Sequence, residues 1–210
     1  MKLLLIRHGE SRGNASRRMQ GRLDEPLTER GREQSRRLAE RLQGWSIKHT
    51  EPISAVYSST LARAYQTASI LVQCWGVPLV LDKRLCERDI GALQGLTWPE
   101  VETRYPQVAQ TMRQKWMVHT LPGGESVFYL TERMWQAITG IVDRTKNDNG
   151  GGCVAIVSHG AAINAYFNRL MGRGDGKPFL FSLGNTSLSI VEFQNGRPRI
   201  LLANDLCHLE

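Results

Sequence analysis

The sequence predicts an α/β fold, a three-layer sandwich in which a mostly parallel central sheet is flanked by helices. Two observations predict it. Short apolar runs alternate along the chain with longer segments of helical periodicity, which is the order that parallel strands and their connecting helices require. The 210 residues are also enough for one substantial core, and no linker divides them, so residues 1–210 are expected to form a single domain.

Strands are expected where apolar runs of three to eight residues are bounded by polar or turn-forming residues. These runs are 2–6, 53–57, 79–81, 153–157, 186–193 and 198–203. Asn195 and Gly196 separate the last two runs and predict a hairpin turn. The hairpin would leave an edge through which two copies could pair, so a homodimer is one expectation.

Helices are expected between the strands, where apolar residues recur at helical spacing. The expected segments are 29–43, 61–74, a short helix from 97, 126–146 and 161–171. Thr28 and Thr60 are predicted N-caps, and Gly44 and Gly76 are predicted helix ends. The irregular segment at about 86–125 is expected to be an insertion that covers the active site.

The charge balance favours acidic ligands. The net charge is +7 and the isoelectric point about 9.5, with arginines concentrated in the first 41 residues. No zinc-finger or RNA-binding signature accompanies them, and the arginines of 30–41 fit the solvent face of a helix. We therefore expect a small phosphorylated metabolite as the partner, and no nucleic acid.

Cysteine usage and hydropathy indicate an ordinary cytoplasmic protein. The four cysteines are scattered and show no metal-ligand pattern, so neither a zinc site nor a disulfide framework is predicted. They are Cys74, Cys86, Cys153 and Cys207. The apolar start is too short for a secretory signal, and no apolar stretch reaches the length of a membrane span.

Reactive side chains follow three of the expected strands. Arg7 and His8 follow the first strand, Arg63 lies just after the second, and His159 follows 153–157. Because the carboxyl ends of parallel strands lie at one edge of a sheet, these four residues are expected to meet there. Singly, an Arg-His pair is more often a surface feature and Ser-His-Gly more often a turn; together they predict a functional site.

Two arginines and two histidines suit phosphoryl chemistry. The planar guanidinium can bind two phosphoryl oxygens at once. A neutral imidazole nitrogen can attack phosphorus, and a second imidazole can supply a proton or positive charge. Gly9 and Gly160 would let a ligand approach the backbone. These residues predict a metal-free phosphoryl pocket.

Several motifs in order give a family resemblance. They are LIRHGES at 5–11 with Asn14, PLTERG at 26–31, YSSTLARAYQTA at 57–68, LCERDIGALQG at 85–95, PGGES at 122–126 and VSHG at 157–160. Over nearly the whole chain the sequence resembles the histidine phosphatase superfamily, in its phosphoglycerate mutase-like branch.

The resemblance implies a covalent mechanism without metal or cofactor. His8 would become phosphohistidine, while Arg7, Arg63 and His159 would hold the phosphoryl oxygens. Glu87 would protonate the leaving oxygen and then take a proton from water, which requires a carboxyl group tuned to hold a proton.

Other roles at the site stay open. Asp89 is the second candidate for the acid, and an ion pair with Arg84 or Arg88 is the structural alternative for Glu87. The expected substrate contacts are Asn14, Gln20, Gly21 and Gly160, and His208 would reach the mouth of the pocket.

Two reactions fit this pocket. A phosphatase gives the phosphoryl group to water, and a cofactor-dependent phosphoglycerate mutase, the alternative, returns it to the substrate. The mutases of the family carry a lysine after the acid loop and an Arg-Arg pair on an inserted segment. Here Thr97 and Trp98 follow that loop, and no Arg-Arg pair occurs between Glu87 and Gly124. The sequence therefore favours a phosphatase. A non-catalytic phosphate binder is disfavoured because His8 and Glu87 are both present.

Overall fold

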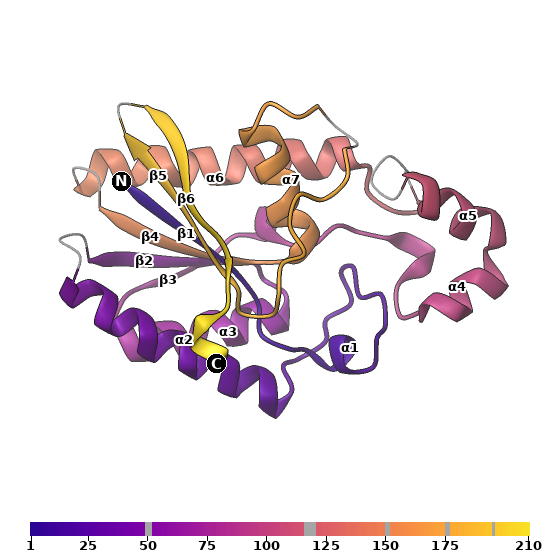
Figure 1. Cartoon of the computed structure of the whole chain (residues 1–210), viewed down its shortest axis with the longest axis horizontal. Coiled ribbons are helices and arrows are strands. Elements are labelled where there is room, and N and C mark those ends of the chain that lie inside the picture. The colour runs from indigo at the N-terminus through magenta and orange to yellow at the C-terminus, as the bar shows by residue number, and fades with distance from the viewer. Residues whose placement is uncertain (49–51, 116–120, 150–151, 175–176, 195) are drawn as a thin grey trace.

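The chain folds around a mixed, mostly parallel sheet (Figure 1). A computed structural model describes residues 1–48, 52–115, 121–149, 152–174, 177–194 and 196–210. Within these residues the strands are β1 (Lys2–Arg7), β2 (Ile53–Ser58), β3 (Leu79–Leu81), β4 (Cys153–Ser158), β5 (Leu188–Gln194) and β6 (Arg197–Asp205). Every run predicted as a strand is a strand, and Asn195 of the predicted turn lies outside the described residues.

The sheet brings the first and fourth strands together at its centre. Its order is β3-β2-β4-β1-β5-β6. The four strands β3, β2, β4 and β1 are parallel, and β5 pairs with β1 and β6 in antiparallel fashion. In the β1–β4 register, Arg7 lies opposite Ser158. His8 and His159, the residues that follow, therefore leave adjacent strands at the same edge.

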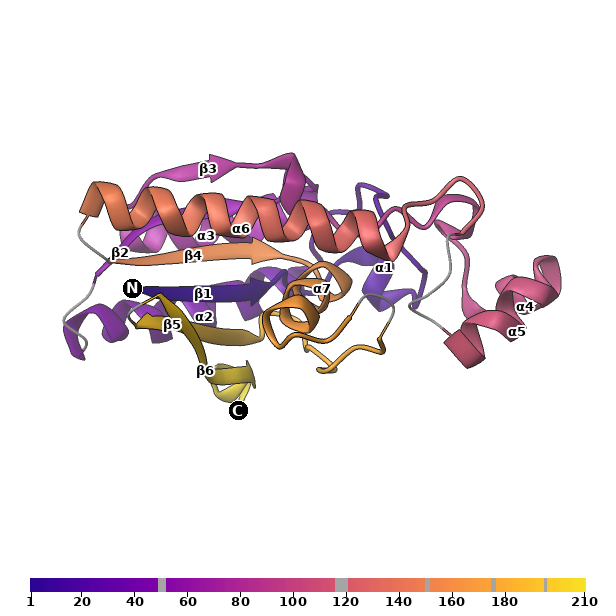
Figure 2. The same ribbon diagram turned by 90° about the horizontal axis from the view of Figure 1, so that it is seen from above.

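Helices cover both faces of the sheet. Their bounds are α1 (Arg12–Ala15), α2 (Glu29–Lys48), α3 (Ala62–Trp75), α4 (Trp98–Arg104), α5 (Pro106–Lys115), α6 (Val127–Asn149) and α7 (Gly160–Leu170). Helices α6 and α7 lie on one face, and α2 and α3 on the other (Figures 1 and 2). This arrangement is the predicted three-layer sandwich.

The two faces explain the uninterrupted apolar run at the start of the chain. Leu3 and Leu5 pack into the core under α6 and α7, whereas Leu4 and Ile6 pack into the core under α2 and α3. All four side chains are buried. A strand covered on both faces shows no alternation of apolar and polar residues, as in other parallel sheets.

Helix ends differ from the prediction at three places. Helix α2 continues through Gly44 to Lys48, because one glycine costs a helix only about 1 kcal/mol and need not end it. Helix α3 has Leu61 rather than Thr60 as its N-cap, and Asp24 Oδ1 accepts from the Ala62 N–H at 2.5 Å instead. Helix α6 extends past Lys146 to Asn149.

Other caps follow the sequence. Thr28 Oγ1 accepts from the Gly31 N–H at 3.0 Å, as an N-cap should. Thr97 and Glu100 form a capping box at the start of α4. Gly76 ends α3 with a φ of 67°, in the left-handed region that glycine tolerates.

The segment predicted as an insertion carries α4 and α5, which lie beyond the carboxyl end of the sheet (Figure 2). It has a small core of its own, formed by Leu93, Val101, Ala109, Met112 and Leu121. Because this core stands at the edge where the strands end, it can form a wall of the site.

Charge and thiols fit the composition. On α2, arginines pair with Glu29 and Glu33, and Arg41 pairs with Asp205 at 2.5 Å, so much of the positive charge of this helix is matched locally. None of the four cysteines, all of which lie in the described residues, is part of a disulfide. Among the helices of the described residues, none has the length and apolarity that crossing a membrane demands.

Candidate active site

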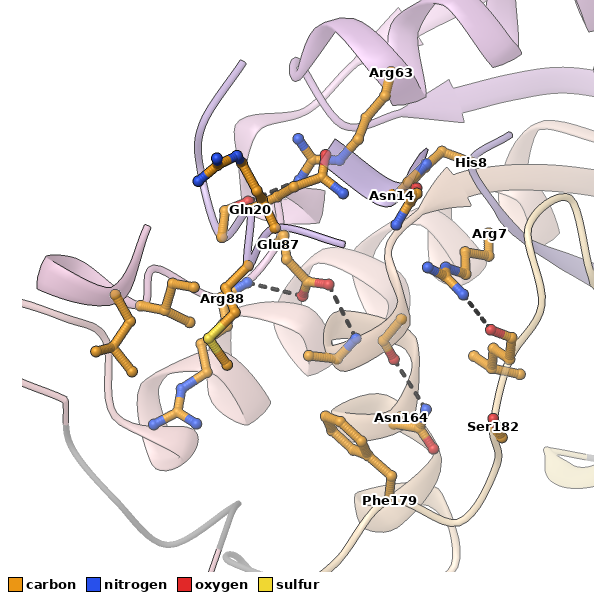
Figure 3. Close-up of a pocket in the computed structure, with 18 of the residues that line it drawn as sticks. Arg7, His8, Asn14, Gln20, Arg63, Glu87, Arg88, Asn164, Phe179 and Ser182 are labelled. Carbon is orange, nitrogen blue, oxygen red and sulfur yellow. Dashed lines mark hydrogen bonds between the residues drawn. The ribbon is translucent and has the colours of Figure 1, made fainter. Parts of the chain in front are cut away.

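A cavity of about 390 Å³ opens at the carboxyl ends of β1, β2 and β4. Arg7, His8, Arg63 and Glu87 contribute to its wall, and Figure 3 shows their polar groups facing a common space. They come from the end of β1, the first turn of α3 and the loop after β3. Residues far apart in the sequence thus meet at one point.

His8 presents one ring nitrogen to this space. Its Nδ1 lies 2.7 Å from the Gly9 carbonyl oxygen, which can only accept, so Nδ1 carries the proton and Nε2 the lone pair. Burial lowers the pKa of His8 well below its ordinary value, and the positive charges of Arg63 and Arg7 lower it further. The imidazole is therefore neutral at neutral pH and has the form of a nucleophile.

Arg7 and Arg63 are both tied to backbone carbonyls. Arg7 donates through Nη1 to the Leu183 carbonyl. Arg63 donates through Nη1 to the Leu23 carbonyl and through Nη2 to the Gly21 carbonyl, and both of these Arg63 bonds are 2.7 Å long. Burial lowers both pKa values, and the charge of Glu87 raises them in part. Arginine keeps its charge under such conditions. The site thus holds two fixed cations.

Both arginines have one buried N–H group that makes no hydrogen bond within the described residues. Among the described residues, the Nε of Arg7 and the Nε of Arg63 have no hydrogen-bond partner. A buried donor without a partner costs free energy, on the order of 1–3 kcal/mol. Phosphoryl oxygens are the natural acceptors for two such donors, so the geometry suits a phosphate group.

His159 lies behind His8 rather than in the lining of the cavity. The ring centroids are 5.1 Å apart, and His159 Nε2 lies 2.8 Å from Ser59 Oγ. Burial, followed by the charge of Arg63, lowers the pKa of His159 well below its ordinary value. Its Nδ1 is buried without a partner among the described residues. His159 is thus fully enclosed and oriented by a hydroxyl group.

The carboxyl group of Glu87, which comes from the loop after β3, lies at the N-terminus of α7. Its Oε2 accepts from the Ala161 N–H at 3.1 Å, and its Oε1 accepts from the Ala162 N–H at 3.0 Å and the Arg88 N–H at 2.9 Å. The carboxyl group is therefore fixed while it faces the cavity. Oε2 makes fewer bonds than Oε1 and is the oxygen better placed to carry a proton to a leaving group.

The alternatives for Glu87 are placed differently. Arg84 pairs with Asp82 at 2.6 Å, and Arg88 donates through Nε to the Glu125 carbonyl at 3.0 Å. Asp89 accepts from the Gly91 N–H and lies 3.9 Å from Arg22, outside the cavity lining. The structure therefore favours Glu87 over Asp89 as the acid.

The predicted rim residues also reach the cavity, where Asn14, Gln20, Gly21 and Gly160 all contribute to the lining. Asn14 Oδ1 accepts from the Ser11 N–H at 3.2 Å, which leaves its amide nitrogen as the group that can face a ligand. Gly21 has a φ of 52°, and a Cβ there would lie 2.6 Å from the Ile90 side chain. This position therefore requires glycine.

Two predicted residues lie elsewhere. His208 is buried against the C-terminal end of the sheet, with Nε2 at 2.8 Å from Thr186 Oγ1, and it does not line the cavity. Burial lowers its pKa to about 4. Gly9 is also outside the lining, and its lack of a side chain serves packing: a Cβ would lie 2.5 Å from the Gly31 carbonyl oxygen. Neither residue is therefore placed to contact a ligand in the cavity.

Three contributors carry no signal that sequence reasoning used. Ser59 orients His159, and Asn185 Nδ2 donates to the His8 carbonyl at 3.1 Å. Arg133, from the second turn of α6, binds the backbone beside Glu87. Each acts through a backbone group or another side chain, and only the fold brings them near the site.

The outer part of the cavity is largely apolar. One wall comes from the insertion and its surroundings, and the other from the loop after α7. The apolar residues concerned are Met19, Ile90, Leu93, Met112, Leu121, Phe179, Phe181 and Leu183. The cavity thus combines a cationic end with an apolar end, as expected for a phosphate group joined to a less polar body.

The cationic end, the neutral imidazole and the facing carboxyl group define a site for phosphoryl transfer. A family model, "Histidine phosphatase superfamily (branch 1)", matches residues 3–206. The chain therefore belongs to the histidine phosphatase superfamily.

Relatives agree with this assignment over the whole chain. "Phosphoglycerate mutase-like protein 4" of Arabidopsis thaliana is 32% identical, covering 100% of this chain and 87% of that protein. "Phosphoserine phosphatase 1" of Hydrogenobacter thermophilus is 31% identical, covering 100% of this chain and 94% of that protein.

Solved structures show the same fold. YhfR of Bacillus stearothermophilus superposes with a TM-score of 0.87 at 31% identity, covering 100% of this chain and 99% of that one. A mycobacterial glucosyl-3-phosphoglycerate phosphatase superposes with a TM-score of 0.82 at 29% identity, covering 97% and 98%. Proteins named as phosphatases thus occur among both kinds of relative.

Proposed function

We propose that this chain is a phosphatase that hydrolyses the phosphate monoester of a small metabolite through a phosphohistidine at His8. One observation carries the proposal: His8, Arg7, Arg63 and Glu87 face the same cavity (Figure 3). Membership of the superfamily and the relatives named as phosphatases support it.

The first step transfers the phosphoryl group to the enzyme. The lone pair on His8 Nε2 forms a bond to phosphorus as the bond from phosphorus to the substrate oxygen breaks. The proton of Glu87 moves to that oxygen, so the substrate leaves as an alcohol and Glu87 becomes a carboxylate. Arg7 and Arg63 stabilise the charge on the phosphoryl oxygens, which is where phosphoryl transfer needs help most.

The second step returns the enzyme to its starting state. A water oxygen bonds to phosphorus as the P–N bond breaks, and Glu87 takes a proton from that water. Inorganic phosphate leaves, His8 Nε2 regains its lone pair, and Glu87 is again protonated. His159 lies behind His8 and keeps a buried Nδ1 without a partner among the described residues, and we assign this nitrogen to a phosphoryl oxygen bound at His8. We assign Asn14, Gln20, Gly21 and Gly160 to contact the substrate.

The proposal needs no metal or cofactor, because both positive charges and the proton come from side chains. We therefore expect activity to survive treatment with a chelator. Cysteines outside any disulfide favour a reducing compartment such as the cytoplasm. Local pairing of the arginines on α2 favours a small ligand over nucleic acid. The homodimer stays a prediction, which sedimentation or light scattering would test.

The test follows two products at once. The enzyme is given 3-phosphoglycerate with a trace of 2,3-bisphosphoglycerate and, in parallel, a panel of phosphate monoesters. We expect inorganic phosphate to be released from members of the panel, and release to disappear in His8→Ala. Rapid formation of 2-phosphoglycerate with little phosphate would instead establish the mutase alternative. Proteins named as phosphoglycerate mutases or as mutase-like also occur among the relatives.

A further inference from the structure

The guanidinium of Arg133 has every one of its N–H groups engaged. Nε donates to Glu125 Oε1 at 2.6 Å, and Nη2 donates to Glu125 Oε2 at 2.8 Å. Nη1 donates to the carbonyls of Arg84 and Cys86, both at 2.7 Å, and Nη2 also donates to the carbonyl of Glu87 at 3.0 Å. Its side chain is only 16% exposed. A guanidinium satisfied on all sides is held in one geometry.

Two of the three carbonyls, those of Cys86 and Glu87, belong to the short stretch of chain that carries Glu87, and the third, that of Arg84, belongs to the turn just before it. This stretch lies between two single 3₁₀ turns, Lys83–Leu85 and Gly91–Leu93, and is not part of the sheet. Ser158, at the end of β4, donates to the Leu85 carbonyl at 2.7 Å and fixes the stretch from the other side. Arg133 thus binds the backbone on both sides of the Glu87 Cα.

Glu125 completes the arrangement. It holds the guanidinium through two parallel hydrogen bonds, and its own N–H donates to the Asp89 carbonyl at 2.8 Å. The PGGES motif therefore contributes a carboxylate that orients Arg133. This ion pair is largely enclosed, with side chains 16% and 11% exposed, so solvent weakens it little.

We propose that Arg133 is a positioning residue that, held by Glu125, sets the place of Glu87 for proton transfer to the leaving oxygen. The inference rests on the proposed function and extends it to residues that touch neither substrate nor phosphoryl group. Moving the Glu87 backbone by about 1 Å would carry its carboxyl group out of hydrogen-bonding reach of the leaving oxygen.

The chemistry separates this role from a purely structural one. A leaving oxygen of low basicity, such as that of 4-nitrophenol, departs with little help from an acid. A basic alkoxide, such as that of benzyl alcohol, depends on the proton. Loss of correct Glu87 placement therefore slows benzyl phosphate hydrolysis far more than 4-nitrophenyl phosphate hydrolysis, whereas general damage to the fold slows both alike.

The experiment measures kcat/KM on these two esters for the full chain. We expect Glu87→Gln to lose about 10²–10⁴-fold on benzyl phosphate and much less on 4-nitrophenyl phosphate. Arg133→Lys keeps the charge but cannot bind three carbonyls and a carboxylate, so it should show the same selective loss, on the order of 10–100-fold. Glu125→Gln, which weakens the hold on Arg133, should show a smaller loss of the same kind.

Two controls make the outcome decisive. Arg144→Lys makes the same change at an exposed arginine of α6 and should leave both rates unchanged. The double variant Glu87→Gln/Arg133→Lys should be no slower on benzyl phosphate than Glu87→Gln alone, because the two residues act through one group.

An equal loss on both esters, or additive losses in the double variant, would overturn the positioning role while leaving the phosphatase assignment intact. If Arg133→Lys is poorly folded, Glu125→Gln decides by the same ratio. A wild-type enzyme that hydrolyses neither ester nor any member of the panel would overturn the proposed function, and this inference with it.

Discussion

The two histidines at the site are buried next to positive charge, an environment that opposes protonation. His8 and His159 are enclosed, and Arg63 and Arg7 stand near both. Burial lowers both pKa values because it disfavours the protonated, charged imidazole, and the positive arginines lower them further by repelling that charge. The arginines that would bind the phosphoryl group therefore also keep the nucleophile in its reactive form, and one arrangement serves both needs.

The electrostatics predict a pH behaviour for His8. Since burial and the nearby arginines hold its pKa well below 6.5, His8 should stay neutral from pH 8 down to about pH 6.5, where an ordinary imidazole is half protonated. ¹⁵N NMR of histidine-labelled protein, assigned with His8→Ala, should show a protonated Nδ1 and an unprotonated Nε2 throughout this range. Titration of the His8 signals with a midpoint near 6.5 would contradict the account.

For single residues, the sequence predicted those site residues whose own side chains would react with or bind the phosphoryl group. Arg7, His8, Arg63 and Glu87 were identifiable because charged groups follow apolar strands or belong to a motif. Asn185 and Arg133 were not, because asparagines and helical arginines are common everywhere, and Ser59 lies in the motif at 57–68 but was not assigned a role. The structure also places His208 against Thr186, whose N–H donates to the His8 carbonyl, so His208 contacts the backbone support of His8 rather than the cavity.

At the scale of elements, hydrogen bonds hold the loop after β1 against the start of α2, and two glycines allow the two backbones to come this close. Thr28 N–H donates to the Glu10 carbonyl at 2.9 Å, and Gln34 accepts from the Glu10 N–H at 2.9 Å. A Cβ on Gly31 would lie 2.0 Å from the Glu10 carbonyl oxygen, and one on Gly9 would lie 2.5 Å from that of Gly31. The PLTERG motif therefore serves close packing beside His8, rather than ligand approach.

This packing can be tested with a matched pair of glycine substitutions. Gly31→Ala should lower the free energy of unfolding by about 1–3 kcal/mol and also reduce kcat, because the backbone next to His8 must move. Gly140→Ala lies inside α6, where the added Cβ would be 3.6 Å from the end of the flexible Arg144 side chain, and it should instead stabilise the protein by about 0.5–1 kcal/mol. Urea unfolding monitored by circular dichroism measures both.

A Gly31→Ala variant with wild-type stability would show that the backbone of α2 can retreat from Glu10 without cost. That result would contradict the close approach on which the explanation of the motif depends.

Element ends were predicted less well than element cores. The strands and the faces of the helices follow from apolar pattern, which burial enforces over many residues. Gly44 failed as a helix end because a single glycine carries only a small penalty. The start of α3 depends on Asp24, a residue distant in sequence, so local pattern could not place it.

For the whole molecule, the sheet order decides where the chemistry lies. Strands β1 and β4 are distant in sequence but adjacent in the sheet, and both end at the same edge. The convergence of His8 and His159 was predictable once parallel strands were assumed. The insertion at about 86–125 was expected to cover the active site, but most of the residues that form its apolar wall were not predictable, because they depend on how this segment folds over that edge.

The combination of a phosphate-binding end and an apolar wall also bears on the choice between phosphatase and mutase. A mutase has to hold a second phosphate and shield the phosphohistidine from water. Among the described residues, the cations in the cavity lining beyond Arg7 and Arg63 are Arg18, which pairs with Glu100 at 3.2 Å, and Arg88, which donates to a backbone carbonyl. Both already have partners, which favours transfer to water.

Trapping the phosphohistidine tests the central claim most directly. The enzyme is mixed with 4-nitrophenyl phosphate, quenched within milliseconds in alkaline denaturant, where phosphohistidine survives, and measured by intact-mass and peptide mass spectrometry. We predict one added phosphoryl group, located on His8, labile to acid and absent from His8→Ala. Steady hydrolysis with no phosphoryl group on His8, or hydrolysis that persists in His8→Ala, would contradict the account.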